Sequence, residues 1–593
     1  MTAEKEIFSK TGQLSADEAV TSVKALGFVD LEGAKTKAVI VEYELPINGA
    51  SVDTTTYRIT NYTLIQIDEN GFDTAIEMDY DGIPGNEGTI ERVYVNDRPE
   101  LSEKGGIKEG RYVIIEVNTA YMLSGQNLSY TASLIAGATQ INPVKTSDGR
   151  TIGPNTREIR NYTESMQPDF RGNMRLVRTV EREGILLPEL SPGSGWTQYH
   201  IGDGAFMATH CYSEYTGRYE DFELPYSLFV PPAALLEANK GKVSLIIHME
   251  HAGSNDTDPM AAVTSSRAAV RLAQMASQKE HPAIIVVPQV EESRRSTDDL
   301  VASSEVNTAV FELLDMLIKT WSAYIDTDRI YGTGQSMGGM TILNMASQRD
   351  HFFAGIAVAG AQWSNSYAKA FQHNGAPARS PENDRISFQG SVDADNYLNW
   401  YYMISDANIL VQTCADDGMA TAEWRYAREY LESAGGHVAY SEWDPWLEID
   451  EQNAMGRELL NRDTSAPGSG ITWVCYTRGS HMSTWKYAYR VDFALEWLFR
   501  QDRSSTLRRG KLKQMKNPWL GRDDTGTIRN GSGTAGLNSA QFTPRGSSRH
   551  YDEGWTPVSV VNALLSGKNS DDTAEANRLY ALLSEEEKRQ INL

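Results

Sequence analysis

Residues 331–340 read Tyr-Gly-Thr-Gly-Gln-Ser-Met-Gly-Gly-Met, and this stretch decides which fold the sequence predicts. Its central pentapeptide, residues 334–338, has the G-x-S-x-G form of a nucleophile elbow. Such an elbow is a tight strand-to-helix turn that presents a serine hydroxyl above the sheet, and flanking glycines remove side chains for which the turn has no room. The pattern predicts Ser336 as a nucleophile. The alternative is a glycine-rich turn with a bystander serine.

The sequence on both sides of the pentapeptide agrees with an elbow. Residues 328–334 contain a short apolar and β-prone run, which predicts a buried strand. Residues 340–346 continue without Gly or Pro, which predicts a helix. The strand, turn and helix therefore follow one another in the order that the motif requires.

Length and composition limit the class of protein. A chain of 593 residues is longer than one hydrophobic core usually supports, so two or more domains are expected. Hydrophobic residues at 40% and charged residues at 23% are typical of a globular protein, and no run is long and apolar enough to span a bilayer. The net charge of −24 argues against a nucleic acid or an anionic membrane surface as partner. Three cysteines are too few for a disulfide framework or a cysteine-rich zinc site.

Residues 1–150 are predicted to form a β-rich domain. Alternating or β-branched runs, separated by clusters of Gly, Asn, Asp and Pro, indicate a series of short strands of a β-sandwich at 38–45, 56–60, 88–95 and 110–117. Before them, residues 16–27 predict a short helix, because Val20, Val23 and Leu26 lie close to one helical face. The polar residues 151–184 are interpreted as a linker with some strand.

Residues 185–503 are predicted to form an α/β domain, because apolar strand-like runs alternate with helical segments. The predicted strands are 243–249, 283–290, 330–333, 355–361, 409–413 and 471–476. The predicted helices are 260–277, 305–322, 340–347 and 420–434. This alternation indicates a mostly parallel sheet covered on both faces. Residues 504–593 form a C-terminal extension, irregular over 521–549 and then helical.

A serine hydroxyl needs a base to remove its proton, and in this fold the base and the acid that orients it come later in the chain. His481 lies in a glycine-containing loop directly after the predicted strand 471–476, so it is the predicted base. The alternatives are His373, in a polar loop, and His437, which follows two glycines at a helix end.

The orienting acid is expected where an apolar strand ends in carboxylates. Residues 408–418 form such a strand and end with Asp416 and Asp417. Asp416 is the first choice and Asp417 the alternate, because spacing does not tell which of two neighbouring side chains faces the histidine. Alternatively, both residues only cap the helix that begins near Thr421.

Two backbone N–H groups are expected to stabilise the negative oxygen of a tetrahedral intermediate. One belongs to Met337, directly after the nucleophile, and the other to the loop after strand 243–249, where Ala252 or Gly253 allows close backbone approach. Gln335, Trp363 and Trp485 are tentative pocket residues, with ordinary packing as the alternative for each.

Residues 222–501 resemble the α/β-hydrolase branch of predicted peptidases, phospholipase/carboxylesterase-like enzymes and poly(3-hydroxybutyrate) depolymerase-like esterases. The resemblance rests on residues 224–231, the loop 251–253, residues 326–331, the elbow with its extra Gly339, and Gly479-Ser480-His481 followed by Trp485. Some members carry an N-terminal immunoglobulin-like domain, so the resemblance implies a bacterial esterase of that arrangement.

The sequence departs from this branch in several places. Gln412-Thr413 stands where members have His-Gly before the acid-bearing loop, and Ala252 replaces a glycine. Residues 442–470 and the C-terminal extension have no counterpart, so they leave the choice of substrate open.

Together these observations predict a serine carboxylesterase with the triad Ser336, His481 and Asp416, acting on a small or polymer-linked ester without metal or organic cofactor. A serine peptidase with the same triad is one alternative. A polysaccharide- or protein-binding module with an inert hydrolase domain is the other. Residues 1–6 lack the apolar core of a signal peptide, which predicts a cytoplasmic protein, or a secreted or cell-surface one if an export signal has been removed.

Overall fold

The structure is a computed structural model, and it describes most of the chain between Gln13 and Ile591. The described residues are 13–31, 33–60, 66–67, 73–74, 90–117, 134–168, 174–180, 182–213, 218–251, 254, 258–276, 280–290, 305–349, 351–361, 404–417, 420–479, 481, 483–512 and short pieces between 558 and 591. The chain divides into two compact units, one made of Met1–Thr197 with Gly253–Val270, the other of Gln198–Ala252 with Arg271–Leu593.

The first unit consists mainly of antiparallel strands. A five-stranded sheet has the order β15-β2-β3-β8-β7, from strands Ile185–Leu186, Val20–Asp30, Gly33–Asn48, Glu109–Val117 and Ile90–Asn96. Smaller sheets and hairpins contain β1 (Gln13–Ser15), β4 (Tyr57–Thr60), β5 (Gln66–Ile67), β6 (Asp73–Thr74), β9 (Gly137–Gln140), β10 (Val144–Lys145), β11 (Thr151–Gly153), β12 (Ile159–Arg160), β13 (Tyr162–Pro168) and β14 (Met174–Val180). The β-rich prediction for this part is confirmed.

Two sequence predictions for the first unit are wrong. Helix α2 covers only Ala16–Ala19, and the rest of the predicted helix 16–27 belongs to β2. Strand β2 pairs with β3 along almost its whole length, so long-range pairing of a run with several β-branched residues overrides the helical spacing. Residues 151–184 are not a linker, because they form β11, β12, β13 and β14, and β11 pairs with β1 in the first unit.

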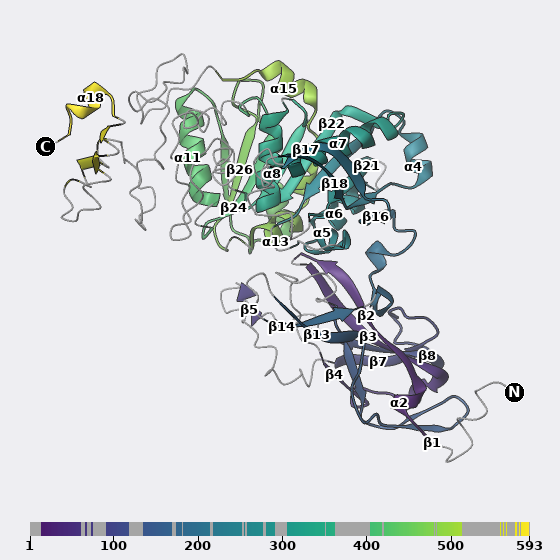
Figure 1. Cartoon of the computed structure of the whole chain (residues 1–593). Coiled ribbons are helices and arrows are strands. Elements are labelled where there is room, and N and C mark those ends of the chain that lie inside the picture. Colours follow the sequence, from purple (N-terminus) through teal and green to yellow (C-terminus); the bar gives the residue numbers. More distant parts are fainter. Residues whose placement is uncertain are drawn as a thin grey trace. The chain divides into compact units, whose positions relative to one another are not determined.

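The second unit is built around a nine-stranded sheet (Figure 1). Its order is β16-β19-β21-β20-β22-β23-β24-β26-β25, from strands Trp196–Tyr199, Tyr226–Phe229, Ala283–Pro288, Val243–Met249, Ile325–Gln335, Gly355–Ala359, Ile409–Cys414, Ile471–Tyr476 and Ala439–Trp443. The strands from β21 to β25 are parallel, and β19 is antiparallel to β21. The predicted parallel sheet is therefore confirmed, while β16, β19 and β25 were not predicted.

Helices cover the sheet of the second unit (Figure 1). The hairpin β17 (Phe206–Ser213) and β18 (Arg218–Leu224) and the helices α4 (Ala233–Ala238), α7 (Glu305–Thr320), α8 (Met337–Gln348), α11 (Ala420–Ser433), α12 (Ile449–Leu460), α13 (Ser483–Arg490), α14 (Phe493–Phe499), α15 (Arg503–Arg509) and α18 (Glu585–Lys588) complete the unit. The predicted helix 260–277 occurs as α5 (Met260–Thr264) and α6 (Ala268–Ala276). The irregular segment expected at 521–549 lies outside the described residues.

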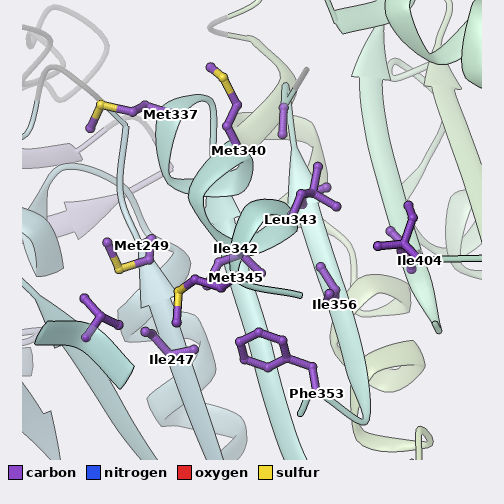
Figure 2. Packing of buried hydrophobic residues seen from close by; sticks show 14 of the residues in the cluster. Ile247, Met249, Met337, Met340, Ile342, Leu343, Met345, Phe353, Ile356 and Ile404 are labelled. Carbon is purple, nitrogen blue, oxygen red and sulfur yellow. The ribbon is translucent and has the colours of Figure 1, made fainter. Parts of the chain in front are cut away.

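Helix α8 is the central helix of the hydrophobic core. Its residues Met340 and Leu343 are buried in one cluster with Ile247 and Met249 of β20 and Ile356 of β23. Figure 2 shows these side chains around α8 and the neighbouring strands. Because α8 begins directly after Ser336, this packing holds the turn that carries the serine.

Truncating a core side chain of α8 tests how much this packing contributes. Leu343→Ala is expected to lower the free energy of unfolding by about 2–5 kcal/mol, because it leaves a cavity in a fully buried position. Leu507→Ala is the matched control, since Leu507 is 59% exposed, and a change within about 0.5 kcal/mol is expected. Urea unfolding followed by tryptophan fluorescence measures both, because every tryptophan except Trp196 belongs to the second unit. Equal effects of the two substitutions would contradict this role of α8.

Candidate active site

Ser336 occupies the tight turn between β22 and α8. Its backbone has φ 47° and ψ −120°, a conformation that side-chain-bearing residues rarely adopt and that is found at functional sites. The Ser336 N–H donates to the carbonyl of Ala359 at the end of β23, at 2.9 Å. A Cβ atom on Gly338 would lie 2.0 Å from the carbonyl oxygen of Met249, so only glycine allows α8 to approach β20 this closely.

The structure brings His481 and Asp417 to Ser336 in a continuous hydrogen-bonded relay. His481 Nε2 lies 2.8 Å from Ser336 Oγ, and His481 Nδ1 lies 2.7 Å from Asp417 Oδ2. The Asp417 side chain is 1% exposed and that of His481 is 23% exposed. With Nδ1–H donating to the buried carboxylate, Nε2 is left to accept the serine proton, as a general base must.

Asp417 faces the histidine, and Asp416 does not. The prediction of Asp416 as the orienting acid is corrected to its alternate, because the Asp416 residue is exposed while its neighbour points inwards. Asp417 Oδ1 also accepts the N–H of Ala420 at the start of α11, at 3.1 Å. The Asp417 carboxylate therefore caps α11 with Oδ1 and holds the His481 imidazole with Oδ2. The alternative that the aspartates cap this helix is thus correct for one oxygen of Asp417.

The other two histidine candidates do not reach the serine. His437 is exposed and precedes β25, so it lies at the edge of the parallel sheet opposite to the end of β22. His373 lies outside the described residues.

Met337, the predicted oxyanion donor, opens α8, and its N–H belongs to the first turn, where helical N–H groups have no acceptor within the helix. The predicted second donor, Ala252 or Gly253, lies outside the described residues. The residues before it are described: the carbonyl of Glu250 would be 2.6 Å from a Cβ on Gly338. The chain that leads to residues 252–253 therefore runs beside the first turn of α8.

The three tentative pocket residues have different positions. Trp485 is buried, stacks on His251 with a centroid distance of 5.2 Å, and meets His481 edge-on at 5.5 Å. It is therefore a support behind the imidazole. Gln335 is fully buried and donates to Glu250 Oε1 at 3.3 Å. Trp363 lies outside the described residues.

A buried polar network, formed by His248, Glu250, Thr333 and Gln335, lies under the turn. His248 Nδ1 is 2.7 Å from Thr333 Oγ1, and His248 Nε2 is 2.6 Å from Glu250 Oε1. Thr333 Oγ1 donates to the Ile247 carbonyl at 3.3 Å, so it accepts the proton on Nδ1. The His248 imidazole and the Glu250 carboxyl group thus share a short hydrogen bond in a buried position. Burial next to Glu250 raises the pKa of Tyr489.

Sequence reasoning missed this network, although the sequence contains a signal for it. His248 lies on β20 and Glu250 directly follows the end of that strand, two residues on, and Thr333 is the register partner of His248 on β22. Polar residues at period two in an otherwise apolar strand indicate a buried polar contact.

Two other features were looked for among the described residues, a metal-binding cluster and a membrane-spanning helix. Within them, no group of three or more His, Cys, Asp or Glu side chains is arranged to hold a metal ion. Among the same residues, no helix is both long and apolar enough to cross a membrane.

Two family models each match a different part of the chain. Residues 22–166 match the family described as the esterase Ig-like N-terminal domain, and residues 308–437 match the prolyl oligopeptidase family. These matches confirm the predicted immunoglobulin-like domain and the α/β-hydrolase fold. A search of the curated proteins found no match.

Several solved structures are similar to the chain. A thermostable esterase is 18% identical, with a TM-score of 0.47, covering 82% of this chain and 100% of its own. An acylaminoacyl peptidase of Pyrococcus horikoshii is 11% identical, with a TM-score of 0.31, covering 62% and 55%. The fluorophosphonate-binding serine hydrolase F of Staphylococcus aureus is 11% identical, with a TM-score of 0.29, covering 52% and 98%.

Neighbouring aspartates offer a matched test of the relay. Asp417→Asn is expected to slow covalent labelling of Ser336 by a fluorophosphonate on the order of 10³–10⁴-fold, because an amide favours the wrong imidazole tautomer. Asp416→Asn removes the same charge one residue away and is expected to leave the labelling rate within about twofold, because Asp416 does not contact His481. The rates are measured under single-turnover conditions. A larger effect at Asp416 than at Asp417 would overturn the correction.

The buried His248–Glu250 pair predicts a stability effect. Glu250→Gln is expected to lower the free energy of unfolding by about 1–3 kcal/mol, because the amide replaces the carboxyl group that makes the short buried hydrogen bond with His248. Glu280→Gln, at an exposed position of the same unit, is expected to change it by less than about 0.5 kcal/mol. Urea unfolding compares the two, and an unchanged midpoint for Glu250→Gln would show that the pair does not stabilise the fold.

Proposed function

We propose that this chain, a serine hydrolase with an α/β-hydrolase fold and an N-terminal immunoglobulin-like domain, is a carboxylesterase. The observation that carries the proposal is the hydrogen-bonded series Ser336, His481 and Asp417, with distances of 2.8 and 2.7 Å. The match of residues 22–166 to the Ig-like domain of esterases favours esters as substrates.

In the proposed mechanism, His481 Nε2 takes the Ser336 proton while Oγ attacks the ester carbonyl. Asp417 holds the imidazole in the required tautomer and stabilises the imidazolium that forms. The negative oxygen of the tetrahedral intermediate accepts one hydrogen bond from the Met337 N–H and a second from the N–H of residue 252 or 253. His481 then protonates the leaving alcohol, and water, activated by the same imidazole, releases the acid from the acyl-enzyme.

Peptide hydrolysis is the second candidate, and one observation favours it: residues 308–437 match the prolyl oligopeptidase family. The same relay would serve, but the leaving amine is more basic than an alcohol and must be protonated as it departs. An inert domain with a purely binding role is not favoured, because Ser336 is held in a strained turn with an oriented histidine, an arrangement that a binding module has no reason to maintain.

Hydrolysis of short p-nitrophenyl esters tests the proposal directly. The unaltered protein is expected to hydrolyse p-nitrophenyl acetate and butyrate. Ser336→Ala is expected to lose at least about 10³-fold in kcat because it lacks the nucleophile. Labelling by a fluorophosphonate, with the modified peptide identified, is expected at Ser336. Equal rates in both proteins, or a label at another residue, would contradict the proposal. Faster cleavage of a peptide than of its matched ester would favour the peptidase.

A further inference from the structure

Two adjacent residues directly after β20, Glu250 and His251, connect the nucleophile to the base. Both are buried, and the relay of Ser336, His481 and Asp417 does not include them. The side chain of the first contacts the strand that carries the nucleophile, and that of the second contacts the helix that follows the base. We name the pair the Glu250–His251 clamp.

Glu250 contacts the nucleophile turn at residues on both sides of Ser336 in the chain. Its Oε1 accepts a hydrogen bond from Gln335 Nε2, one residue before the serine, at 3.3 Å. Its backbone carbonyl oxygen would be 2.6 Å from a Cβ on Gly338, two residues after the serine, so the Glu250 backbone lies directly against the first turn of α8. The carboxyl group is itself held by the 2.6 Å hydrogen bond that it shares with His248 Nε2.

His251 reaches the catalytic imidazole through Trp485. The His251 ring stacks on the indole, with ring centroids 5.2 Å apart and an angle of 9° between the planes. The indole in turn meets the His481 ring edge-on, at a centroid distance of 5.5 Å and an angle of 85°. Trp485 is buried, and a buried side chain in a close-packed interior has little room to move away from either ring.

The position of His481 Nε2 depends on more than the bond to the acid. The hydrogen bond of 2.7 Å between Nδ1 and Asp417 Oδ2 fixes one atom of the ring, but the ring can still turn about that bond. Two further contacts restrict this rotation. One is the edge-on contact with Trp485, and the other is with the backbone of Gly360, where a Cβ would lie 3.3 Å from His481 Cε1. Together they fix the plane of the imidazole and therefore the place of Nε2.

These contacts form a closed loop that begins and ends at the reacting atoms. From Ser336 the loop passes through the residue before it to the clamp, then through Trp485 to His481. The distance of 2.8 Å between His481 Nε2 and Ser336 Oγ closes it. Because the two clamp residues are joined by a planar peptide bond, a displacement of one also displaces the other. The clamp therefore couples the position of the nucleophile to that of the base.

We infer that Glu250 and His251 are positioning residues that hold Ser336 Oγ and His481 Nε2 at the distance and angle that proton transfer requires. This inference rests on the proposed function, in which His481 removes the serine proton. Because the clamp acts through Gln335 and Trp485 on the reacting atoms, its loss is expected to slow the chemical step and to leave substrate binding unchanged. A misplacement of about 1 Å in such a site can lower a rate by roughly 100-fold.

Labelling of Ser336 by a fluorophosphonate reports on this geometry without requiring ester hydrolysis. Glu250→Met keeps the length of the side chain but removes the carboxyl group. It is expected to lower the maximal labelling rate roughly 10- to 100-fold and to change the half-saturating probe concentration by less than about twofold. Leu313→Ala is the control for lost stability alone, because Leu313 is fully buried on α7 and its truncation leaves a cavity. Folded Leu313→Ala is expected to be labelled within about twofold of the normal rate.

A second pair of variants tests the ring stack, and it carries the test if Glu250→Met does not fold. His251→Leu is expected to slow labelling roughly 10- to 100-fold, because the flat contact with Trp485 is lost. His251→Phe retains a flat ring and is expected to stay within about threefold of the unaltered protein. Glu250→Met/His251→Leu is expected to be slowed by less than the product of the two single effects, because both substitutions misalign the same two atoms.

The outcomes separate this inference from the proposed function. Unchanged labelling rates in Glu250→Met and His251→Leu, or an equal loss in Leu313→Ala, would overturn the positioning role while leaving the esterase proposal intact. Single effects that multiply in the double variant would overturn the coupling of nucleophile and base. Labelling of Ser336 that depends on the clamp, in a protein that hydrolyses no p-nitrophenyl ester, would support the clamp and contradict the carboxylesterase.

Discussion

The backbone turn at Ser336 is the constraint on which the catalytic unit depends. A non-glycine residue at φ 47° is held only because the surroundings impose that conformation. The Ala359 carbonyl binds its N–H on one side, and α8 packs onto β20 and β23 on the other. The glycine at 338 lets the first turn of α8 touch the backbone of β20. The packing of α8 thus stabilises a conformation that would be unfavourable in isolation.

The same parallel sheet brings the remaining groups together. Because β22, β24 and β26 run in one direction, Ser336, Asp417 and His481 all follow the carboxyl ends of their strands and meet at one edge. Under that edge, β20 presents Ile247 and Met249 on one face and His248 on the other, where Glu250, directly after the strand, hydrogen-bonds to it. One strand therefore supports the turn with an apolar core on one side and a buried polar network on the other.

Local patterns in the sequence were sufficient for the parts of the site that depend on local structure. The elbow, the inner strands and His481 each have a signal within about ten residues. The sequence contains no signal for the choice between Asp416 and Asp417, because that choice depends on which of the two side chains turns inwards at the end of the strand. The prediction of a helix over residues 16–27 was wrong for a related reason. Most of these residues belong to β2, which is stabilised by its pairing with β3, and the spacing of three apolar residues within the segment does not reveal that partner strand. Strand β25 precedes β26 in the chain, but in the sheet β26 pairs with β24 and β25 forms the edge. The order of the strands along the chain therefore did not reveal where residues 444–449 lie.

The relay residues follow inner strands of the sheet, and backbone hydrogen bonds such as that from the Ser336 N–H to the Ala359 carbonyl hold the loops that carry them. The loop after β25 lies at the edge of the sheet, and the hydrogen bond from the Thr477 N–H to the Trp443 carbonyl joins the end of β25 to the loop after β26. Binding residues are commonly on loops that a rigid scaffold positions, and here the scaffold is the parallel sheet itself.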